Sequence, residues 1–302
     1  SFISNMKKIF LSLILLPLIL DASTRLIVLG SGTPNPDPAR NGSAYAVIVN
    51  DQPYLIDFGP GVVRSAAALS PEWGGAIKGM SVKNLEHAFL THIHSDHSAG
   101  LADLMLTPWI MGRDKKLKLF GPIGLDQMAR STLNAFKEDI NYRINGTQPS
   151  NKIGYQYEFN VLSEGLIYKD KNVSVEAFKV PHGGFDDAYG FKFTTKDKVI
   201  VFSGDTGPSK KLEKFASGAD ILVHEVYSHA GFLKKTKDWQ RYHQGHHTST
   251  FEVGEIASRA KPKLLLLSHI LFWGSSPEDI IKETKLTYDG QIKIAEDLMI
   301  IE

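Results

Sequence analysis

Histidine residues are concentrated in one short stretch of this chain. His92-Ile-His94-Ser-Asp96-His97 follows directly on the β-like run from His87 to Thr91. Two histidines at alternate positions of an extended segment point to the same side, and Ser95 is placed to cap a helix that begins after it. Imidazole and carboxylate groups are the ligands expected for a catalytic rather than a structural Zn²⁺ site. A histidine-rich surface loop would not explain the apolar strand before the motif, so we expect a metal centre at the end of a strand.

The composition narrows what this metal centre can contain. The chain has no cysteine, which excludes disulfides, iron–sulfur clusters, thiolate zinc sites and a cysteine nucleophile. Any metal site must therefore use the 11 histidines together with Asp and Glu. The formal net charge is only +1, so no overall field attracts a polyanion.

The beginning of the chain has the pattern of a secretory signal peptide. Lys7 and Lys8 precede the uncharged run from Ile9 to Leu20. This run is too short to span a bilayer, which needs ~20 apolar residues, and Pro17 argues against a buried helix. We expect residues 1–22 to comprise a remnant or misplaced start before Met6, then the signal peptide. The mature protein is then periplasmic or secreted, with no stable membrane anchor.

The remainder of the chain, residues 23–302, is expected to form one catalytic domain. Short β-rich runs such as 44–49 and 199–203 alternate with helical patterns such as 250–260 and 277–285, which indicates layered α/β or α+β architecture. The early strands are joined by short turns such as Asn50-Asp51-Gln52. We therefore expect antiparallel pairing there and not a purely parallel sheet.

The histidine motif resembles the signature of the metallo-β-lactamase superfamily, and the resemblance extends over residues 25–302. It implies an α+β fold, the four-layer αββα sandwich. Leu55-Ile-Asp57-Phe-Gly59 resembles the early Asp-x-Gly motif that supports the site. Three further motifs, each at the end of an expected strand, contain His182, Asp205 and His269. The resemblance implies one zinc on His92, His94 and His182, a second zinc on Asp96, His97 and His269, and Asp205 bridging both.

Two such ions can share a water molecule and lower its pKa to near neutrality. The resemblance thus implies a zinc-dependent hydrolase that uses a metal-bridging hydroxide, with Mn²⁺ or Fe²⁺ as alternatives to Zn²⁺. Asp96 is placed to orient the hydroxide as well as to bind metal. A non-catalytic zinc-binding scaffold is the alternative from another class, and the intact ligand set argues against it.

Two further motifs resemble those of ribonuclease Z. Val223-His224-Glu225-Val226 is similar to its His-Glu-Ala-Thr motif, and Gly245-His246-His247-Thr248-Ser249 to its Gly-His-Ser-Thr motif. In that enzyme the glutamate orients a histidine that protonates the leaving oxygen. Adjacent residues of a strand face opposite sides, so we assign Glu225 to the site and His224 to packing. We choose His247 over His246; a solvated loop with a helix cap at Thr248 or Ser249 is the competing interpretation.

Several features argue against tRNA processing. Asp205 follows His182 by only 23 positions, whereas ribonuclease Z usually carries its tRNA-binding arm between these ligands. The basic runs 113–118 and 234–237 are expected to be solvated surface. The bridging Asp205 and the absence of cysteine argue against a true β-lactamase. The chain is also similar to the secreted arylsulfatases of the superfamily, so we rank a small sulfate or phosphate ester first; RNA cleavage and β-lactam or lactone hydrolysis are alternatives.

The expected partner is therefore a small-molecule ester, without nucleic acid, and a homodimer is left open. Aromatic side chains near the site are expected to set the size of the substrate, although each fits ordinary core packing equally well. These candidates are Trp109, Phe232, Trp239, Tyr242, Phe272 and Trp273.

Overall fold

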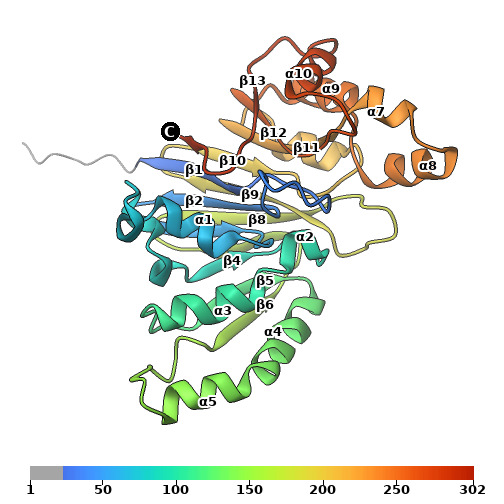
Figure 1. Ribbon diagram of the computed structural model, residues 1–302. Helices are drawn as coiled ribbons and strands as arrows, with labels where there is room; N and C mark the ends of the chain where they lie inside the picture. The colour runs from blue at the N-terminus through green and yellow to red at the C-terminus, as the bar shows by residue number, and fades with distance from the viewer. Residues whose placement is uncertain (1–22) are drawn as a thin grey trace, which may run out of the picture.

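A computed structural model describes residues 23–302, which form two seven-stranded sheets packed face to face (Figure 1). In spatial order, the first sheet contains β14 (Ile300–Ile301), β1 (Thr24–Gly30), β2 (Ala44–Val49), β3 (Gln52–Ile56), β4 (His87–Phe89), β5 (Leu117–Gly121) and β6 (Tyr157–Val161). The second contains β13 (Ile292–Ile294), β12 (Leu264–Leu271), β11 (Ile221–Tyr227), β10 (Val199–Phe202), β9 (Tyr189–Thr195), β8 (Val173–Lys179) and β7 (Gly165–Lys169).

Helices cover the outer face of each sheet. The first sheet carries α1 (Val62–Leu69), α3 (Leu101–Ile110), α4 (Ile123–Ala135) and α5 (Lys137–Asn145), with short 3₁₀ turns η1 (Pro71–Trp73), η2 (Lys78–Met80) and η3 (Val82–Asn84). The second carries α6 (Lys210–Phe215), α9 (Thr250–Ala260) and α10 (Pro277–Thr284). The remaining helices are α2 (Ser95–Ser98), α7 (His229–Leu233) and α8 (Lys237–His246). The four-layer αββα arrangement is thus confirmed.

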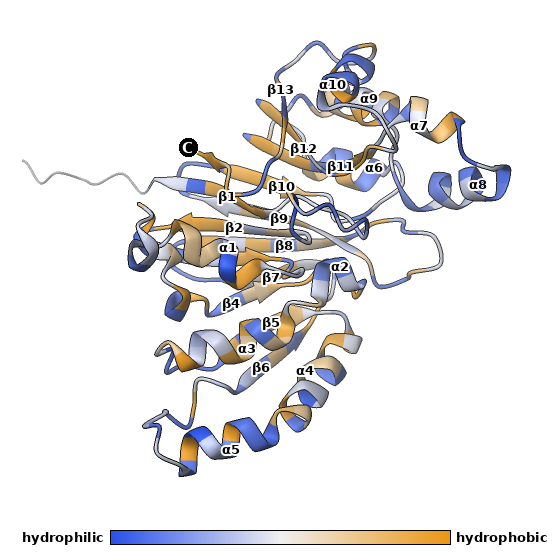
Figure 2. Cartoon of the chain, in the orientation of Figure 1, coloured by the Kyte–Doolittle hydropathy of each residue, from blue (hydrophilic) through white to orange (hydrophobic). Residues whose placement is uncertain are grey.

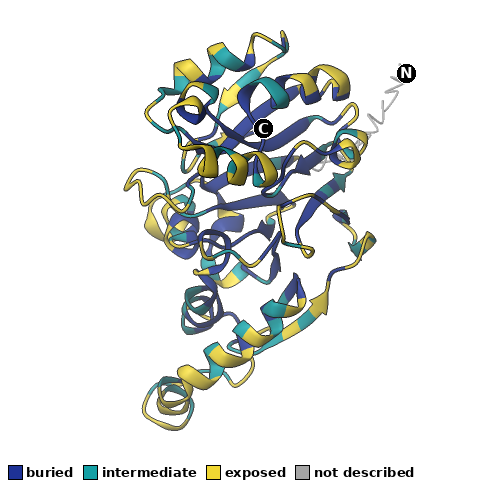
Figure 3. Ribbon diagram, turned by 90° about the vertical axis from the view of Figure 1, so that its right-hand side faces the viewer, coloured by how far each residue is buried: buried dark blue, intermediate teal, exposed yellow. Residues whose placement is uncertain are grey.

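Alternation of side chains along the strands creates three apolar layers. In β1, Leu26 and Val28 pack between the two sheets, whereas Ile27 and Leu29 pack under the helices of the first sheet. In β12, Leu266 faces the other sheet and Leu265 faces the outer helices. Because both faces of the central strands are buried, these strands are nearly continuous apolar runs, and they form the buried centre of the molecule (Figure 3).

Each sheet is partly antiparallel and partly parallel. β2 and β3 pair antiparallel through a turn in which Asn50 and Asp51 have φ angles of 51° and 61°. Such left-handed turn residues match the twist of a two-residue hairpin, and the expected antiparallel pairing is confirmed. β3, β4, β5 and β6 then run parallel, as do β10 to β13. Connections that follow parallel strands emerge at the same edge of a sheet, which is where the histidine motif lies.

The expectation that residues 113–118 are solvated surface was wrong for Arg113. This side chain is 1% exposed, and its guanidinium donates to the main-chain carbonyls of Leu85, Leu104, Met105 and Gly154. A guanidinium has five N–H donors, so hydrogen bonds to these carbonyls can compensate for the loss of water when Arg113 is buried. Arg113 therefore fastens the end of α3 to the loop before β6.

The cap of α2 differs from expectation, and the expected signal peptide falls outside the part of the chain that the structure describes. Ser95 is the first residue of α2 rather than its cap, since His94 occupies the cap position. The expected signal peptide lies outside the described residues. Within residues 23–302, no helix has the length and apolar character needed to cross a membrane. α8 is strongly hydrophilic and projects beside the histidine motif (Figure 2).

Candidate metal centre

Three loops that each follow a strand, together with the end of a fourth strand, bring the expected ligands together at one edge of the sandwich. The loop after β4 contributes residues 92–97, the loop after β8 contributes His182, and the loop after β10 contributes Asp205. His269 comes from within β12, near its end. The site is therefore built by both sheets, and its geometry depends on how they pack.

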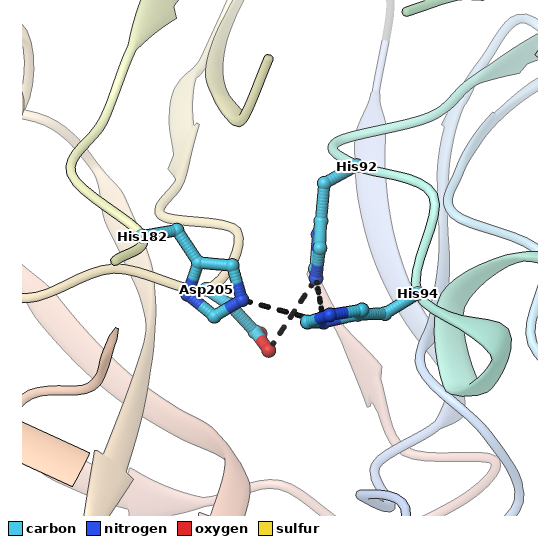
Figure 4. Close-up of side chains that lie close together, drawn as sticks. All are labelled: His92, His94, His182 and Asp205. Atoms are coloured by element: carbon cyan, nitrogen blue, oxygen red, sulfur yellow. Dashed lines mark hydrogen bonds and ion pairs between the residues drawn. The ribbon is translucent and has the colours of Figure 1, made fainter. Parts of the chain in front are cut away.

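The first group contains His92, His94, His182 and Asp205 (Figure 4). The distance from His94 Nδ1 is 3.0 Å to His92 Nε2 and 3.3 Å to His182 Nε2. Asp205 Oδ2 lies 3.6 Å from His92 Nε2. Three imidazole nitrogens and a carboxylate oxygen thus converge from different directions, as ligands of a single ion do.

The second group contains Asp96, His97, His269 and again Asp205. Asp96 Oδ2 lies 3.0 Å from His269 Nε2 and 3.3 Å from His97 Nε2, and Asp205 Oδ1 lies 3.3 Å from His97 Nε2. In each group the ligand atoms lie within 4.8 Å of one another. Asp205 belongs to both groups and has two carboxylate oxygens close to their ligand atoms, so its carboxylate can bridge two ions.

The electrostatics of these groups fit bound cations. His97 Nε2 and Asp205 Oδ1 are buried and have no hydrogen-bond partner. Burial disfavours the charged form of His269, but the carboxylates of Asp205 and Asp96 outweigh it and raise the pKa of His269 to about 9. This end of the site therefore attracts positive charge. In the other group, burial lowers the pKa of His182 to about 4, which leaves its ring neutral and able to bind metal.

Hydrogen bonds behind the rings hold them in orientation. His97 Nδ1 donates to Asp57 Oδ2 over 2.7 Å, and Asp57 also accepts from the amide and hydroxyl of Thr91. His92 Nδ1 lies 3.0 Å from the Thr91 hydroxyl, and His182 Nδ1 lies 2.8 Å from the main-chain carbonyl of His246. These contacts leave the Nε2 atoms of all three rings directed at the site.

A bulge in β12 aims His269 at this site. His224 and Val226 of β11 pair with Leu267 and Ile270, so Glu225 alone is opposite Ser268 and His269. Strict alternation would place His269 on the outer face with Leu267, but its φ angle of 48° interrupts the alternation. Left-handed backbone in a non-glycine residue costs of order 1–3 kcal/mol and is concentrated at functional sites.

Glu225 and His247 form a hydrogen-bonded pair beside the ligands. His247 Nδ1 lies 2.8 Å from Glu225 Oε1, and Glu225 also accepts from the amides of Thr206 and Thr248. His224 lies on the other face of β11, where its ring is fully buried. The loop after His247 also contains the helix cap considered from the sequence, because the Ser249 hydroxyl accepts from the amide of Glu252 in α9.

The protonation of this pair is set by burial. Burial, followed by the charge of Asp205, raises the pKa of Glu225 well above its ordinary value. Burial also lowers the pKa of His247 to about 4. Both shifts disfavour a carboxylate beside an imidazolium, so burial favours a neutral pair that shares a proton between Glu225 Oε1 and His247 Nδ1. In such a pair the other ring nitrogen of His247, Nε2, carries a proton.

A pocket of about 420 Å³ opens beside the ligands, within the range of ligand sites. Of the expected aromatic residues, Trp239, Tyr242 and Trp273 line it, and Phe272 lines a neighbouring pocket. Trp109 and Phe232 do not line it: Trp109 is buried under the helices of the first sheet, and Phe232 is buried in a cluster behind Leu271 and Trp273. Sequence reasoning missed Asn35, Lys235 and His243, which also line it; the spacing of His243 midway between Trp239 and His247 was an available signal.

Comparison with known proteins establishes the family. The model of the β-lactamase superfamily domain matches residues 53–270. This chain is a member of the metallo-β-lactamase superfamily. Curated relatives include ribonuclease Z of Mycolicibacterium gilvum strain PYR-GCK, which is 30% identical over 90% of this chain and 93% of the relative. Ribonuclease Z of Mycobacterium sp. strain KMS is 31% identical over 91% and 94%. These relatives favour ribonuclease Z over arylsulfatase.

Solved structures of metallo-β-lactamase proteins share the fold. YhfI of Bacillus subtilis has a TM-score of 0.69 at 18% identity, covering 92% of this chain and 98% of its own. The short form of human tRNase Z has a TM-score of 0.68 at 20% identity, with the same coverage. Together with the family match, the findings identify a hydrolase of the metallo-β-lactamase superfamily that resembles ribonuclease Z.

Proposed function

We propose that this protein is a metal-dependent phosphodiesterase with the chemistry of ribonuclease Z, cleaving an RNA substrate. The observation that carries the proposal is the 2.8 Å hydrogen bond between Glu225 and His247, directly beside two ligand groups that share Asp205. The relatives named ribonuclease Z support this choice, and they reverse the order in which a small ester came first and nucleic acid was not expected.

The ligand groups are proposed to hold two zinc ions, or Mn²⁺ or Fe²⁺ in their place. One ion would be held by His92, His94 and His182, the other by Asp96, His97 and His269, with Asp205 bridging. When bound, the two ions lower the pKa of a water molecule and stabilise charge that develops at the attacked phosphorus. Asp96 is proposed to orient that water, because its carboxylate lies at the edge of the pocket.

His247 is proposed as the general acid. When the bond between phosphorus and the leaving oxygen breaks, the oxygen takes the proton of His247 Nε2. The proton shared with Glu225 then moves fully to Nδ1, so the ring remains neutral and Glu225 becomes the carboxylate. Glu225 is a positioning residue here, since it acts through the imidazole and does not touch the substrate.

A small sulfate or phosphate ester is the second candidate, and one observation favours it. The segment between His182 and Asp205 contains little beyond the hairpin of β9 and β10, with no arm of the kind that ribonuclease Z usually carries there. Export of the protein, its single-domain organisation and a homodimer also stay predictions. The scaffold alternative predicts metal binding without turnover.

The test is a hydrolysis panel with the zinc-loaded protein. Its substrates are a tRNA precursor, a bis-nitrophenyl phosphate, an aryl sulfate, a lactone and nitrocefin. The proposal predicts cleavage of the tRNA precursor and the phosphodiester, and loss of both in Asp205→Ala. Turnover of the aryl sulfate alone would support the second candidate, and turnover of none would support the scaffold.

A further inference from the structure

One face of α8 carries a column of rings that leads from solvent to the ligands. Trp239 and His243 are four residues apart, which places them on one face of α8, and His247 follows directly after the last residue of the helix. The ring centroids of Trp239 and His243 are 5.6 Å apart, and those of His243 and His247 are 5.9 Å apart. The column continues to the metal-ligand candidate His269, whose ring lies 6.1 Å from His247.

Two more aromatic side chains and one positive charge lie beside this column and form, together with it, one wall of the pocket. Tyr242 stacks on His246 at 4.1 Å, and the Trp273 ring lies 4.4 Å from His243. Lys235 Nζ lies 4.6 Å from the centroid of the Trp273 ring. Trp239, Tyr242, Trp273 and Lys235 all line the 420 Å³ pocket that contains His247. The wall therefore combines flat apolar surfaces with a cation.

Trp273 also packs against the buried cluster of Tyr227, Phe232 and Leu271, but core packing does not account for Trp239 and Tyr242. Trp239 is 55% exposed, Tyr242 is 42% exposed, and α8 has no fully buried residue. Most residues of α8 are exposed to solvent, as the colouring by burial in Figure 3 shows. Exposed aromatic rings that meet in a concave site are typical of binding surfaces, not of structural helices.

α8 is held in a fixed position relative to the ligands. The carbonyl of Gly245 accepts from the amide of Gly183, and the carbonyl of His246 accepts from His182 Nδ1. Gly183 has a φ angle of 58° and lies directly against the His246 ring, so a side chain at this position would strain the backbone and displace that ring. A group stacked on α8 is thus held at a set distance from His182 and His247.

We propose that Trp239, Tyr242, His243 and Trp273 form a subsite for a planar ring that the substrate carries next to its scissile ester, with Lys235 contacting the neighbouring anionic group. The inference rests on the proposed function, since it assigns substrate specificity to the same site. A planar ring can be a nucleobase of RNA or the aryl group of a small ester. Both kinds of ring stack on aromatic side chains, and the positive charge of Lys235 attracts the phosphate or sulfate attached to the ring-bearing group.

The experiment compares ligands that differ only by the ring. Calorimetric titration of the zinc-loaded protein measures the affinities of adenosine 5′-monophosphate against ribose 5-phosphate, and of phenylphosphonate against methylphosphonate. The ring-bearing member of at least one pair should bind about tenfold more tightly. A preference in the first pair alone indicates a nucleobase, and one in the second pair alone indicates an aryl group.

Matched variants test whether these side chains cause the preference for the ring-bearing ligand. The double variant Trp239→Ala with Tyr242→Ala should bring the ratio of affinities for the ring-bearing and ring-free ligands to about one. The single variant Trp239→Phe should preserve this ratio. Trp73→Ala is the control, because Trp73 is an equally accessible tryptophan, 75% exposed in η1 and away from this pocket. Lys235→Gln should weaken all four ligands alike, and Lys234→Gln should not.

Equal affinities within both pairs in the wild type, or a ratio unchanged in the double variant, would overturn the subsite. This readout is separate from turnover. If the wild type cleaves no phosphodiester but still prefers the ring, the proposed reaction fails and the ring subsite stands.

Discussion

At the scale of single residues, the proton held between Glu225 and His247 determines the proposed chemistry. Burial disfavours the charged form of both side chains, because it lowers the pKa of His247 and raises that of Glu225. Their 2.8 Å hydrogen bond engages Nδ1 of His247 and leaves Nε2 as the ring nitrogen that we propose donates its proton. The pair could be predicted from motifs and strand alternation, but its protonation depends on burial that the motifs do not show.

Replacing this general acid should affect substrates according to their leaving group. His247→Ala should slow an alkyl or ribose ester by ~10²- to 10⁴-fold but a nitrophenyl ester little, because nitrophenolate leaves without a proton. Metal content should not change, since His247 belongs to neither ligand group. Steady-state rates on both esters, with metal analysis of the variant, test this; equal slowing of both esters would exclude the general-acid role.

The orientation of His269 and the burial of Arg113 could not be predicted from the sequence, because both depend on three-dimensional geometry. His269 was correctly expected near the ligands, yet plain alternation along β12 would direct it outward, and only the bulge with its left-handed φ angle directs it inward. Arg113 was expected in solvent because its neighbours are lysines, but two carbonyls of the preceding helix α3 and the carbonyls of Leu85 and Gly154 make its burial favourable. Both outcomes depend on contacts that no local pattern contains.

At the scale of elements, prediction succeeded for segments with a clear apolar pattern and failed for two segments that have no fully buried residue. The strand 44–49 and the helix 250–260 have the bounds expected from their patterns. β7 and α8 were missed, since β7 has no fully buried residue in its pattern and α8 packs none into the core. The missed α8 is nevertheless the element that lines the pocket.

The capping boxes of α9 and α10 offer a matched pair of substitutions. Ser249 caps α9 directly after His247, and Ser276 caps α10 with the same reciprocal hydrogen bonds away from the pocket. Ser249→Ala and Ser276→Ala should each lower the free energy of unfolding by about 1 kcal/mol. Only Ser249→Ala should also reduce turnover, because it loosens the segment that holds His247. Denaturant titration and rate measurements on both variants check this; an equal loss of turnover in the two would contradict it.

At the scale of the whole molecule, the two sheets place titratable groups at opposite ends of the sandwich. His87 begins β4, whereas the ligand motif follows the end of the same strand. Burial lowers the pKa of His87 to about 4, and its Nε2 lies 3.1 Å from the hydroxyl of Tyr168. Its ring contacts Tyr54 and Tyr168 and belongs to neither ligand group, so we expect its titration to report on folding.

The unfolded chain should therefore bind a proton at His87 more readily than the folded chain between pH ~6.5 and about 4. The contribution of neutral His87 to stability is complete above pH ~6.5 and is lost as the pH falls through this window. From pH 7 to pH 5, the wild type should lose about 2 kcal/mol relative to His87→Gln. Chemical unfolding of both proteins with a chelator present measures this, and a pH-independent difference would show that His87 does not titrate as described.

Metal binding should also stabilise the folded molecule as a whole. The ligand groups join loops from both sheets, and the unfolded chain has no such preformed site. Removing the metal with a chelator should lower Tm, and adding excess zinc should restore it. A Tm that is unaffected by chelation, with metal loss verified, would mean that the two sheets do not depend on bound ions.

The central claim is that two ions share Asp205, and counting the metal bound to each chain tests it most directly. Mass-spectrometric metal analysis of the folded wild type should give about two transition-metal ions per chain, and Asp205→Ala should give fewer. Circular dichroism would verify that the variant is folded. At most one tightly bound ion in both the wild type and Asp205→Ala would contradict the account.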